Sequence, residues 1–248
     1  MAYIDEIRKM NLETSKGERF NENDLIYINA LYTAINNIEQ RYLKRITPLS
    51  NGKEVEVIER EYSSELKTQT YTVFRDDDSN PLCLYCDHEG SKTFFCKPWD
   101  SLCSDDKYPD IIIHKGDLPE SGIQEIVCEI KRLSQLGSEK MLVDLNKLTT
   151  ISGREIWEGH GYRIPIFIVS NGTKAQLEDR IKNFKNVKYT IHDLLLGKRN
   201  RRMSFKEYVT ENQERLKNVI CLCHSVEAIV ETCTVYDVVR SKIGREKL

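Results

Sequence analysis

Two short apolar segments with acidic residues at their ends constrain the fold of this chain more than any other feature. The first segment follows Asp110 and the second ends at Glu129 and Lys131, and both have the β-branched, apolar composition of buried strands. Because side chains alternate between the two faces of a strand, Glu129 and Lys131 share one face and Ile130 lies on the other. Pairing of the two strands would bring Asp110 beside Glu129. Burying such charges costs several kcal/mol unless they are paired or bind a cation, so the pattern favours a divalent-metal site.

Composition sets the broad class of the protein. The chain has 248 residues, 40% of them hydrophobic and 31% charged, with a net charge of −2. These values predict a globular protein whose overall charge does not indicate nucleic-acid binding, although a local basic patch would suffice for it. The longest apolar runs are shorter than the ~18 residues that span a bilayer, and no signal peptide is visible at the start. We therefore expect a cytoplasmic protein without a membrane segment.

The segments before the two strands predict one helix and two further strands. Residues 23–46 carry apolar side chains at three- and four-residue spacing, which is typical of an amphipathic helix. Glu39 falls within that apolar stripe. Its carboxylate either reaches water at the edge of the stripe or points toward the acidic site. Residues 53–62 and 69–75 alternate or are rich in β-branched and aromatic residues, so both are predicted to be strands.

A cysteine-rich stretch at 83–103 is predicted to be an insertion. It contains Cys83, Cys86, Cys96 and Cys103, and the first two have the Cys-x-x-Cys spacing of a zinc knuckle. One interpretation is a small structural zinc site, because a long loop without regular structure needs a tether. The alternative is a set of half-buried thiols. With no leader visible, reduced thiols or a metal cluster are favoured over a disulfide framework.

The segments after the two strands alternate between helix and strand. The pattern predicts a helix over 133–151, a buried strand over 163–169 and a helix that Thr173 caps. Basic residues then cluster before a C-terminal region that is read as helical from 204 to about 240, with a wide apolar stripe that includes three further cysteines. The basic cluster is either a phosphate contact or a solvated turn, and it consists of Lys198, Arg199, Arg201 and Arg202.

Pro109-Asp110, followed by Glu129-x-Lys131, resembles the signature of the PD-(D/E)xK nuclease superfamily. The resemblance covers roughly residues 23–46 and 105–195. It implies an α/β, restriction-endonuclease-like fold with a mixed central sheet flanked by helices. On this interpretation, residues 1–197 form the nuclease core, the cysteine-rich stretch is an insertion, and residues 198–248 form a basic turn with a helical C-terminal extension.

The resemblance also implies a chemistry. Asp110, Glu129 and the carbonyl of Ile130 would hold Mg²⁺ or Mn²⁺, Lys131 would orient or help deprotonate the attacking water, and Glu39 would be an additional acid from the first helix. A nearby metal should favour a lower pKa for Lys131. Arg132, Lys140 and Lys147 are further candidate phosphate contacts.

The function implied is metal-dependent endonucleolytic cleavage of DNA, of a restriction or defence type. Many such enzymes act as homodimers, and the apolar C-terminal helices could supply that interface. Three alternatives stay open at this point. They are a catalytically silent nucleic-acid- or protein-binding module on the same fold, an RNA or repair nuclease, and a zinc-organised interaction protein.

Overall fold

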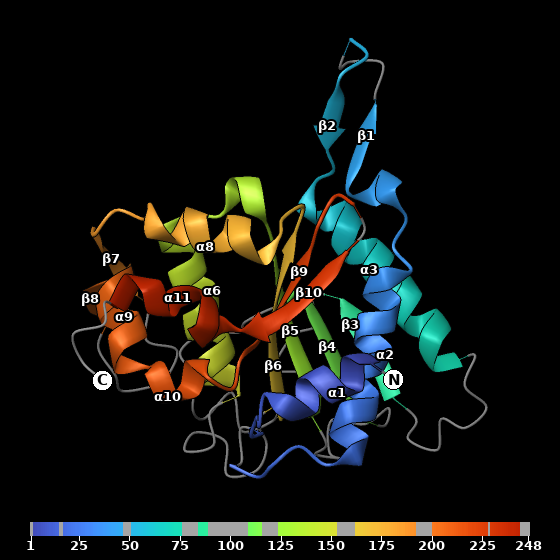
Figure 1. Cartoon of the computed structure of the whole chain (residues 1–248), viewed down its shortest axis with the longest axis horizontal. Helices are drawn as coiled ribbons and strands as arrows, with labels where there is room; N and C mark the ends of the chain where they lie inside the picture. The colour runs from blue at the N-terminus through green and yellow to red at the C-terminus, as the bar shows by residue number, and fades with distance from the viewer. Residues whose placement is uncertain are drawn as a thin grey trace.

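The computed structural model describes residues 2–14, 17–46, 51–75, 84–88, 109–115, 124–152, 162–191, 200–227 and 229–243. Within these residues the chain is a mixed α/β protein built on a central sheet (Figure 1). No helix of this part of the chain is both long enough and apolar enough to cross a membrane.

The central sheet has the strand order β10-β9-β6-β5-β4-β3 among the described residues. Its strands are β3 (Leu84–His88), β4 (Ile111–Lys115), β5 (Gln124–Arg132), β6 (Ile164–Ser170), β9 (Ile220–His224) and β10 (Val230–Thr234). Strands β5, β6 and β9 run parallel to one another, whereas β3–β4, β4–β5 and β9–β10 are antiparallel pairs. The predicted pairing of the two central strands is therefore confirmed, with Ile111 opposite Cys128.

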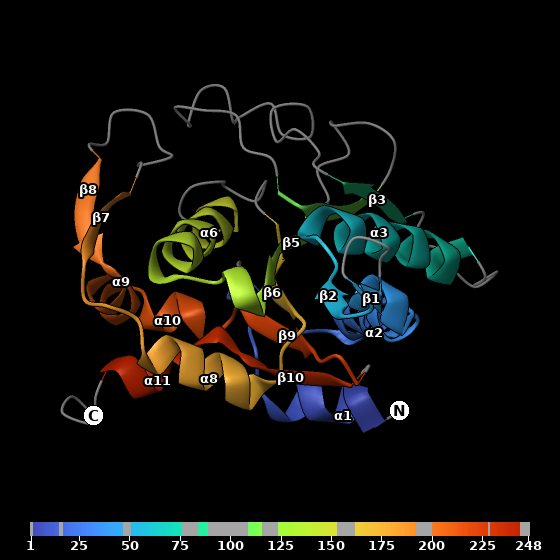
Figure 2. The same ribbon diagram turned by 90° about the horizontal axis from the view of Figure 1, so that it is seen from above.

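Each face of the sheet is covered by helices (Figure 2). One face packs against α1 (Ala2–Lys9), α2 (Glu22–Asn36) and α3 (Glu59–Arg75), and its core includes Ile111, Cys128 and Ile130. The other face packs against α6 (Ser138–Ile151), α8 (Lys174–Lys182), α9 (Phe205–Glu211) and α11 (Val235–Ile243), and its core includes Val127 and Phe167. Alternation along β5 thus sends the side chains of Ile130 and Glu129 to opposite faces, as predicted.

The shorter elements join this framework. Among the described residues, the 3₁₀ turns are η1 (Gln40–Tyr42) and η4 (Leu133–Gln135), and α10 (Gln213–Leu216) precedes β9. In the same part of the chain, two small antiparallel ribbons lie outside the central sheet. They are β1 (Lys44–Ile46) with β2 (Glu54–Glu56), and β7 (Lys188–Ile191) with β8 (Arg201–Ser204). Figure 1 shows that the β1–β2 ribbon projects from the body of the molecule next to the start of α3.

Three predictions about the N-terminal half were wrong in whole or in part. The helix expected over 23–46 ends at Asn36, and residues 69–75, predicted to be a strand, belong to α3. The strand predicted over 53–62 is confirmed only for Glu54–Glu56, because α3 begins at Glu59. The β-branched residues in α3 suggested a strand, but Tyr62, Leu66 and Thr70 are buried at a spacing of four residues, which is helical. Packing of this stripe against the sheet decided the conformation, because tertiary contacts override weak local propensity.

The prediction that residues 204 to about 240 are helical holds for α9, α10 and α11 but is wrong for the segment between α10 and α11. Residues 220–224 and 230–234 are strands of the central sheet, and β9 lies between β6 and β10. Cys221 and Cys223 face one core and Leu222 faces the other, so the apolar run belongs to a strand buried on both faces. A run of this kind cannot be distinguished from a buried helix by periodicity alone. Because these side chains are buried within the molecule, they do not form the surface expected to support a dimer.

Helix and strand predictions for 133–184 agree well with the structure. Strand β6 is buried along its whole length, and Thr173 caps α8 through a hydrogen bond from the Gln176 amide to its hydroxyl oxygen. The Gln176 side chain accepts a hydrogen bond from the Thr173 amide in return, which completes a capping box. The cap fixes where α8 begins after β6, and α8 then covers the same face of the sheet as α6.

Candidate active site

The candidate site lies where β5 ends, beside the start of β4 and the start of α3. Asp110 precedes β4, and its Oδ2 accepts a hydrogen bond of 2.7 Å from the amide of Ile130 on β5. This contact brings Asp110 next to Glu129, as the antiparallel register requires. The predicted juxtaposition of Asp110, Glu129 and Lys131 at one edge of the sheet is therefore present in the structure.

Lys131 lies at the centre of the charged cluster. Its Nζ is 3.0 Å from Glu59 Oε1, 3.6 Å from Asp144 Oδ2 and 4.0 Å from Asp110 Oδ2. It also donates a hydrogen bond of 2.9 Å to the carbonyl oxygen of Ile130. One ammonium group thus contacts acids from α3, from α6 and from the residue before β4.

Glu129 is the most deeply buried member of the cluster. Its side chain is fully buried on the face of β5 that α6 covers, and Lys147 Nζ of α6 lies 2.7 Å from Oε1. Despite this close ion pair, neither carboxylate oxygen accepts a hydrogen bond of good geometry from the described residues, and the same holds for Asp144 Oδ2. Buried carboxylate oxygens normally have such partners, so Glu129 Oε2 can accept a further ligand, whereas Oε1 already faces the Lys147 ammonium.

Burial shifts two acids of the cluster, Glu129 and Asp144, in one direction. Burial raises the pKa of Glu129 well above its usual range, and Asp110 and Asp144 raise it further, although Lys147 opposes them. Burial likewise raises the pKa of Asp144 to about 6, against the opposing effect of Lys131 and Lys147. Removal of these two carboxylates from water is thus the main cause of both shifts.

The acids around Lys131 raise its pKa, and the lowering expected from a bound metal stays a prediction. Burial pulls its pKa down, but Asp144, Asp110 and Glu59 outweigh this effect, and the net pKa is raised. In this charge environment Lys131 is an ammonium group. It is thus placed to orient a water molecule or to offset negative charge on a substrate.

The residues of the cluster fit a hard divalent cation. Four carboxylates, those of Glu59, Asp110, Glu129 and Asp144, surround only two ammonium groups, which leaves two negative charges uncompensated when all are ionised. Carboxylate and carbonyl oxygens are the donors that Mg²⁺ prefers, and it keeps several waters, so one or two carboxylates suffice. As the side chains stand, the described part of the chain has no group of three His, Cys, Asp or Glu arranged to hold a metal ion.

Glu39 does not take the place expected for it. It follows α2, its side chain is 60% exposed, and its Oε1 accepts a hydrogen bond of 3.0 Å from Arg41. The chain leaves the helical path at Asn36, so the apolar stripe that appeared to include Glu39 ends before it. The acids that helices contribute to the cluster are Glu59, at the first turn of α3, and Asp144 of α6.

Sequence reasoning missed Glu59 and Asp144, and it named Lys147 only as a phosphate contact. Glu59 was hidden because its segment was predicted to be a strand. Asp144 carried a readable signal, since it is an acid beside Leu145 within the apolar stripe of the helix predicted over 133–151. Arg132, another predicted phosphate contact, instead donates to the carbonyl oxygen of Val57 and lies 3.7 Å from Glu56.

The other predicted sites are only partly described. Cys86 lies on β3, whereas Cys83, Cys96 and Cys103 are outside the described residues, so the zinc prediction remains a prediction. Lys198 and Arg199 are also outside them. Arg201 and Arg202 are exposed on β8, and Arg201 forms an ion pair of 2.6 Å with Glu211.

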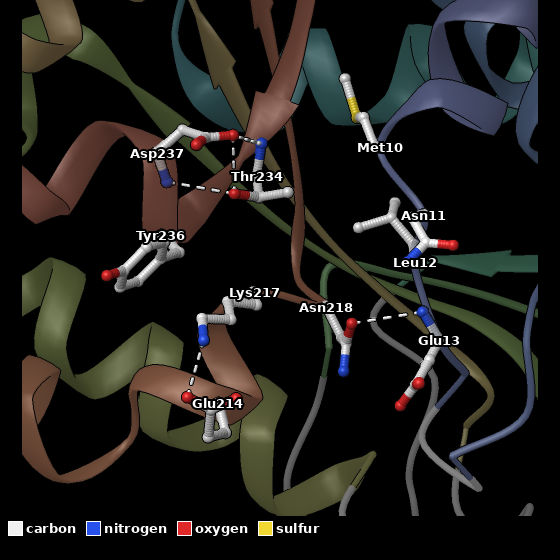
Figure 3. Close-up of a pocket in the computed structure, with 10 residues that line it drawn as sticks. All are labelled: Met10, Asn11, Leu12, Glu13, Glu214, Lys217, Asn218, Thr234, Tyr236 and Asp237. Atoms are coloured by element: carbon white, nitrogen blue, oxygen red, sulfur yellow. Dashed lines mark hydrogen bonds and ion pairs between the residues drawn. The ribbon is translucent and has the colours of Figure 1, made fainter. Parts of the chain in front are cut away.

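A separate cavity of about 500 Å³ lies toward the other end of the parallel strands, and Figure 3 shows the residues that line it. It is bordered by Thr234, which pairs with Ile220 at the start of β9, whereas the charged cluster lies where the parallel strand β5 ends. Polar groups around this cavity already pair with one another, as Lys217 does with Glu214 and Thr234 with Asp237. We therefore assign the candidate chemistry to the cluster on β5 and not to this cavity.

Comparison with known proteins gives no relationship that could assign this site: no family model matches the chain, and neither the curated proteins nor the solved structures contain a significant match.

Proposed function

We propose that this protein is a divalent-metal-dependent endonuclease that hydrolyses phosphodiester bonds in DNA, with a restriction-endonuclease-like core. The observation that carries the proposal is the contact of Asp110 with the amide of Ile130, which places the Asp110 carboxylate beside Glu129 and Lys131. A proline-aspartate pair and a Glu-x-Lys sequence are common by themselves. Their convergence at one end of the central strands, with a buried Glu129 Oε2 that has no hydrogen-bond partner among the described residues, is less common.

The arrangement of elements also supports the proposal. A helix that carries an acid, α3, precedes three antiparallel strands, and α6 then leads to β6, which is parallel to β5. The resemblance to the PD-(D/E)xK superfamily likewise implies a helix with an acid before the paired strands and a helix that leads into a buried strand after them. Glu59 fills the role of the additional helix-borne acid that was assigned to Glu39.

All members of the charged cluster except Lys147 have a role in the proposed reaction. Asp110, Glu129 and the Ile130 carbonyl would hold Mg²⁺ or Mn²⁺, which supplies Lewis-acid stabilisation of the phosphate charge and a more acidic bound water. Lys131 would orient the attacking water and offset charge on the phosphate. Glu59 and Asp144 would hold the Lys131 ammonium in position through their contacts of 3.0 and 3.6 Å.

Incubation of the full chain with supercoiled plasmid, linear duplex, single-stranded DNA and RNA tests this proposal. We expect cleavage of DNA with Mg²⁺ or Mn²⁺ and none with EDTA. Glu129→Gln and Lys131→Met should each lower the rate by at least about 100-fold, because each removes a group that acts on the developing charge. Lys206→Met, at an exposed position on α9, is the control and should cut normally.

Three outcomes would contradict the proposal or narrow it. Full activity of Glu129→Gln would exclude the site. Binding of DNA without cleavage under any metal condition would favour a catalytically silent module on the same fold. Preferential cleavage of RNA would keep the site and the metal chemistry but replace the substrate.

A further inference from the structure

Lys147 is the member of the described charged cluster that has no role in the proposed reaction. It lies on α6, its side chain is 18% exposed, and its Nζ is 2.7 Å from Glu129 Oε1. Glu129 is a proposed metal ligand, and its carboxylate is fully buried. A lysine at this distance places a positive charge where the proposed metal would also place one.

The Lys147 ammonium and the proposed metal ion repel each other, so they are alternative partners for the Glu129 carboxylate. An ionised buried carboxylate without a partner is strongly unfavourable, so Glu129 stays ionised in the metal-free site only if a positive charge lies nearby. Lys147 supplies that charge from a helix one layer away, while Lys131 is held by Glu59 and Asp144. A divalent cation bound to Glu129 would instead repel Lys147, and the effect is large because the site is buried and little screened.

We propose that Lys147 is a tethered counter-cation for Glu129 that competes with the divalent metal and so sets the metal concentration at which the site loads. The inference rests on the proposed metal chemistry and assigns Lys147 as a positioning residue, not a catalytic one. In the metal-free protein it keeps the Glu129 carboxylate compensated. On metal binding, the Lys147 ammonium leaves Glu129 for the solvent-exposed side of α6.

Calorimetric titration of the full chain with Mn²⁺ tests the inference without any measurement of cleavage. Lys147→Met should bind Mn²⁺ at least about tenfold more tightly than the wild type, because one competing charge has been removed. Lys147→Arg keeps the charge and should bind with an affinity close to that of the wild type. Lys140→Met removes the same charge from an exposed position on α6 and controls for net charge.

Thermal unfolding gives an independent readout. In EDTA, Lys147→Met should have a lower Tm than the wild type, because Glu129 is then buried without a cation. Saturating Mn²⁺ should raise the Tm of this variant by more than it raises that of the wild type. If Lys147→Met does not fold in EDTA, refolding it in Mn²⁺ gives the same comparison, and the double variant Glu129→Gln/Lys147→Met should fold without metal.

The outcomes separate this inference from the proposed function. Equal or weaker Mn²⁺ binding by Lys147→Met, with normal binding by the wild type, would overturn the inference and leave the nuclease proposal standing. Absence of Mn²⁺ binding by both proteins would overturn both. Tighter binding by Lys140→Met as well would show a general charge effect and would also overturn the specific role of Lys147.

Discussion

Asp110 has two roles at the residue scale, one structural and one chemical. Its Oδ2 satisfies the amide of Ile130, and the same carboxylate is a proposed metal ligand. These roles are separable because an amide oxygen can accept the hydrogen bond but carries no charge. Asp110→Asn therefore removes only the negative charge, whereas Asp110→Ala also removes the hydrogen-bond acceptor.

We expect Asp110→Asn to fold with nearly normal stability and to lose metal-dependent cleavage. Asp110→Ala should lose cleavage and also about 1 to 3 kcal/mol of unfolding free energy, because the Ile130 amide is left without its partner. Chemical denaturation and the plasmid assay measure the two effects separately. Equal stability of the two variants would show that the hydrogen bond contributes nothing to the fold.

His224 on β9 is a second residue whose environment has a measurable consequence. It is fully buried, its Nδ1 lies 3.0 Å from the Tyr62 hydroxyl of α3, and its Nε2 has no hydrogen-bond partner among the described residues. Burial lowers the pKa of His224 to about 4 from its usual value of 6.5. The unfolded chain therefore binds this proton at a higher pH than the folded chain does.

We expect His224 to lower the free energy of unfolding as the pH falls from about 6.5 to about 4, because the unfolded state gains the proton first. Between pH 7 and pH 4.5 the loss of unfolding free energy from His224 is about 2 to 3 kcal/mol. Glu129 and Asp144 act in the opposite sense, since their pKa values are raised in the folded state. Guanidinium unfolding in EDTA at both pH values should show a smaller loss for His224→Gln than for the wild type, and equal losses would contradict the assignment.

At the scale of elements, α2 is fixed to the sheet by a buried ion pair. Asp24 belongs to the capping box of α2, and its carboxylate is 3.1 Å from the guanidinium of Arg163, the residue before β6. Asp24 Oδ2 also accepts a hydrogen bond from the Asn21 amide. The helix cap and the start of a central strand are thereby joined through one carboxylate.

Arg163→Met should destabilise the protein by about 3 to 5 kcal/mol, because it leaves a buried aspartate without its cation. Combining it with Asp24→Asn should recover much of that loss, since the amide keeps the cap and carries no charge. Urea denaturation of the two single variants and the double variant measures the coupling. Strictly additive losses would mean that the two residues stabilise the fold independently.

Element boundaries also decided which acid entered the site. The sequence identified the strands around Asp110 and Glu129 because both are bounded by charges and filled with branched apolar residues. It placed the helix-borne acid wrongly, since Glu39 continues the apolar spacing of α2 after the backbone has already turned away. Helix ends depend on capping and packing, which a periodic pattern does not contain.

At the scale of the whole molecule, the C-terminal region is part of the core. Strand β9 lies between β6 and β10, and α11 covers the same face as α6 and α8. Residues 198–248 therefore cannot be removed as an extension. Their loss would expose the apolar faces of β6 and of the helices around it.

A fragment of residues 1–197 should consequently fail to fold cooperatively. We expect it to lack a near-ultraviolet circular dichroism signal and a sigmoidal urea transition, both of which the full chain should show. The reason is that two strands of the central sheet, β9 and β10, and the helices α9, α10 and α11 would be missing. Cooperative unfolding of the fragment would restore the two-part division that the sequence suggested.

The sequence by itself determined the two central strands, their side-chain alternation and the presence of Asp110, Glu129 and Lys131 at one edge. These features depend on local period and charge, which can be read from neighbouring residues. Only the tertiary structure decided that Glu59, Asp144 and Lys147 join them and that 220–234 completes the sheet. Those contacts join residues separated by up to 72 positions in the chain, and they depend on the packing of α3 and α6, which no local pattern encodes.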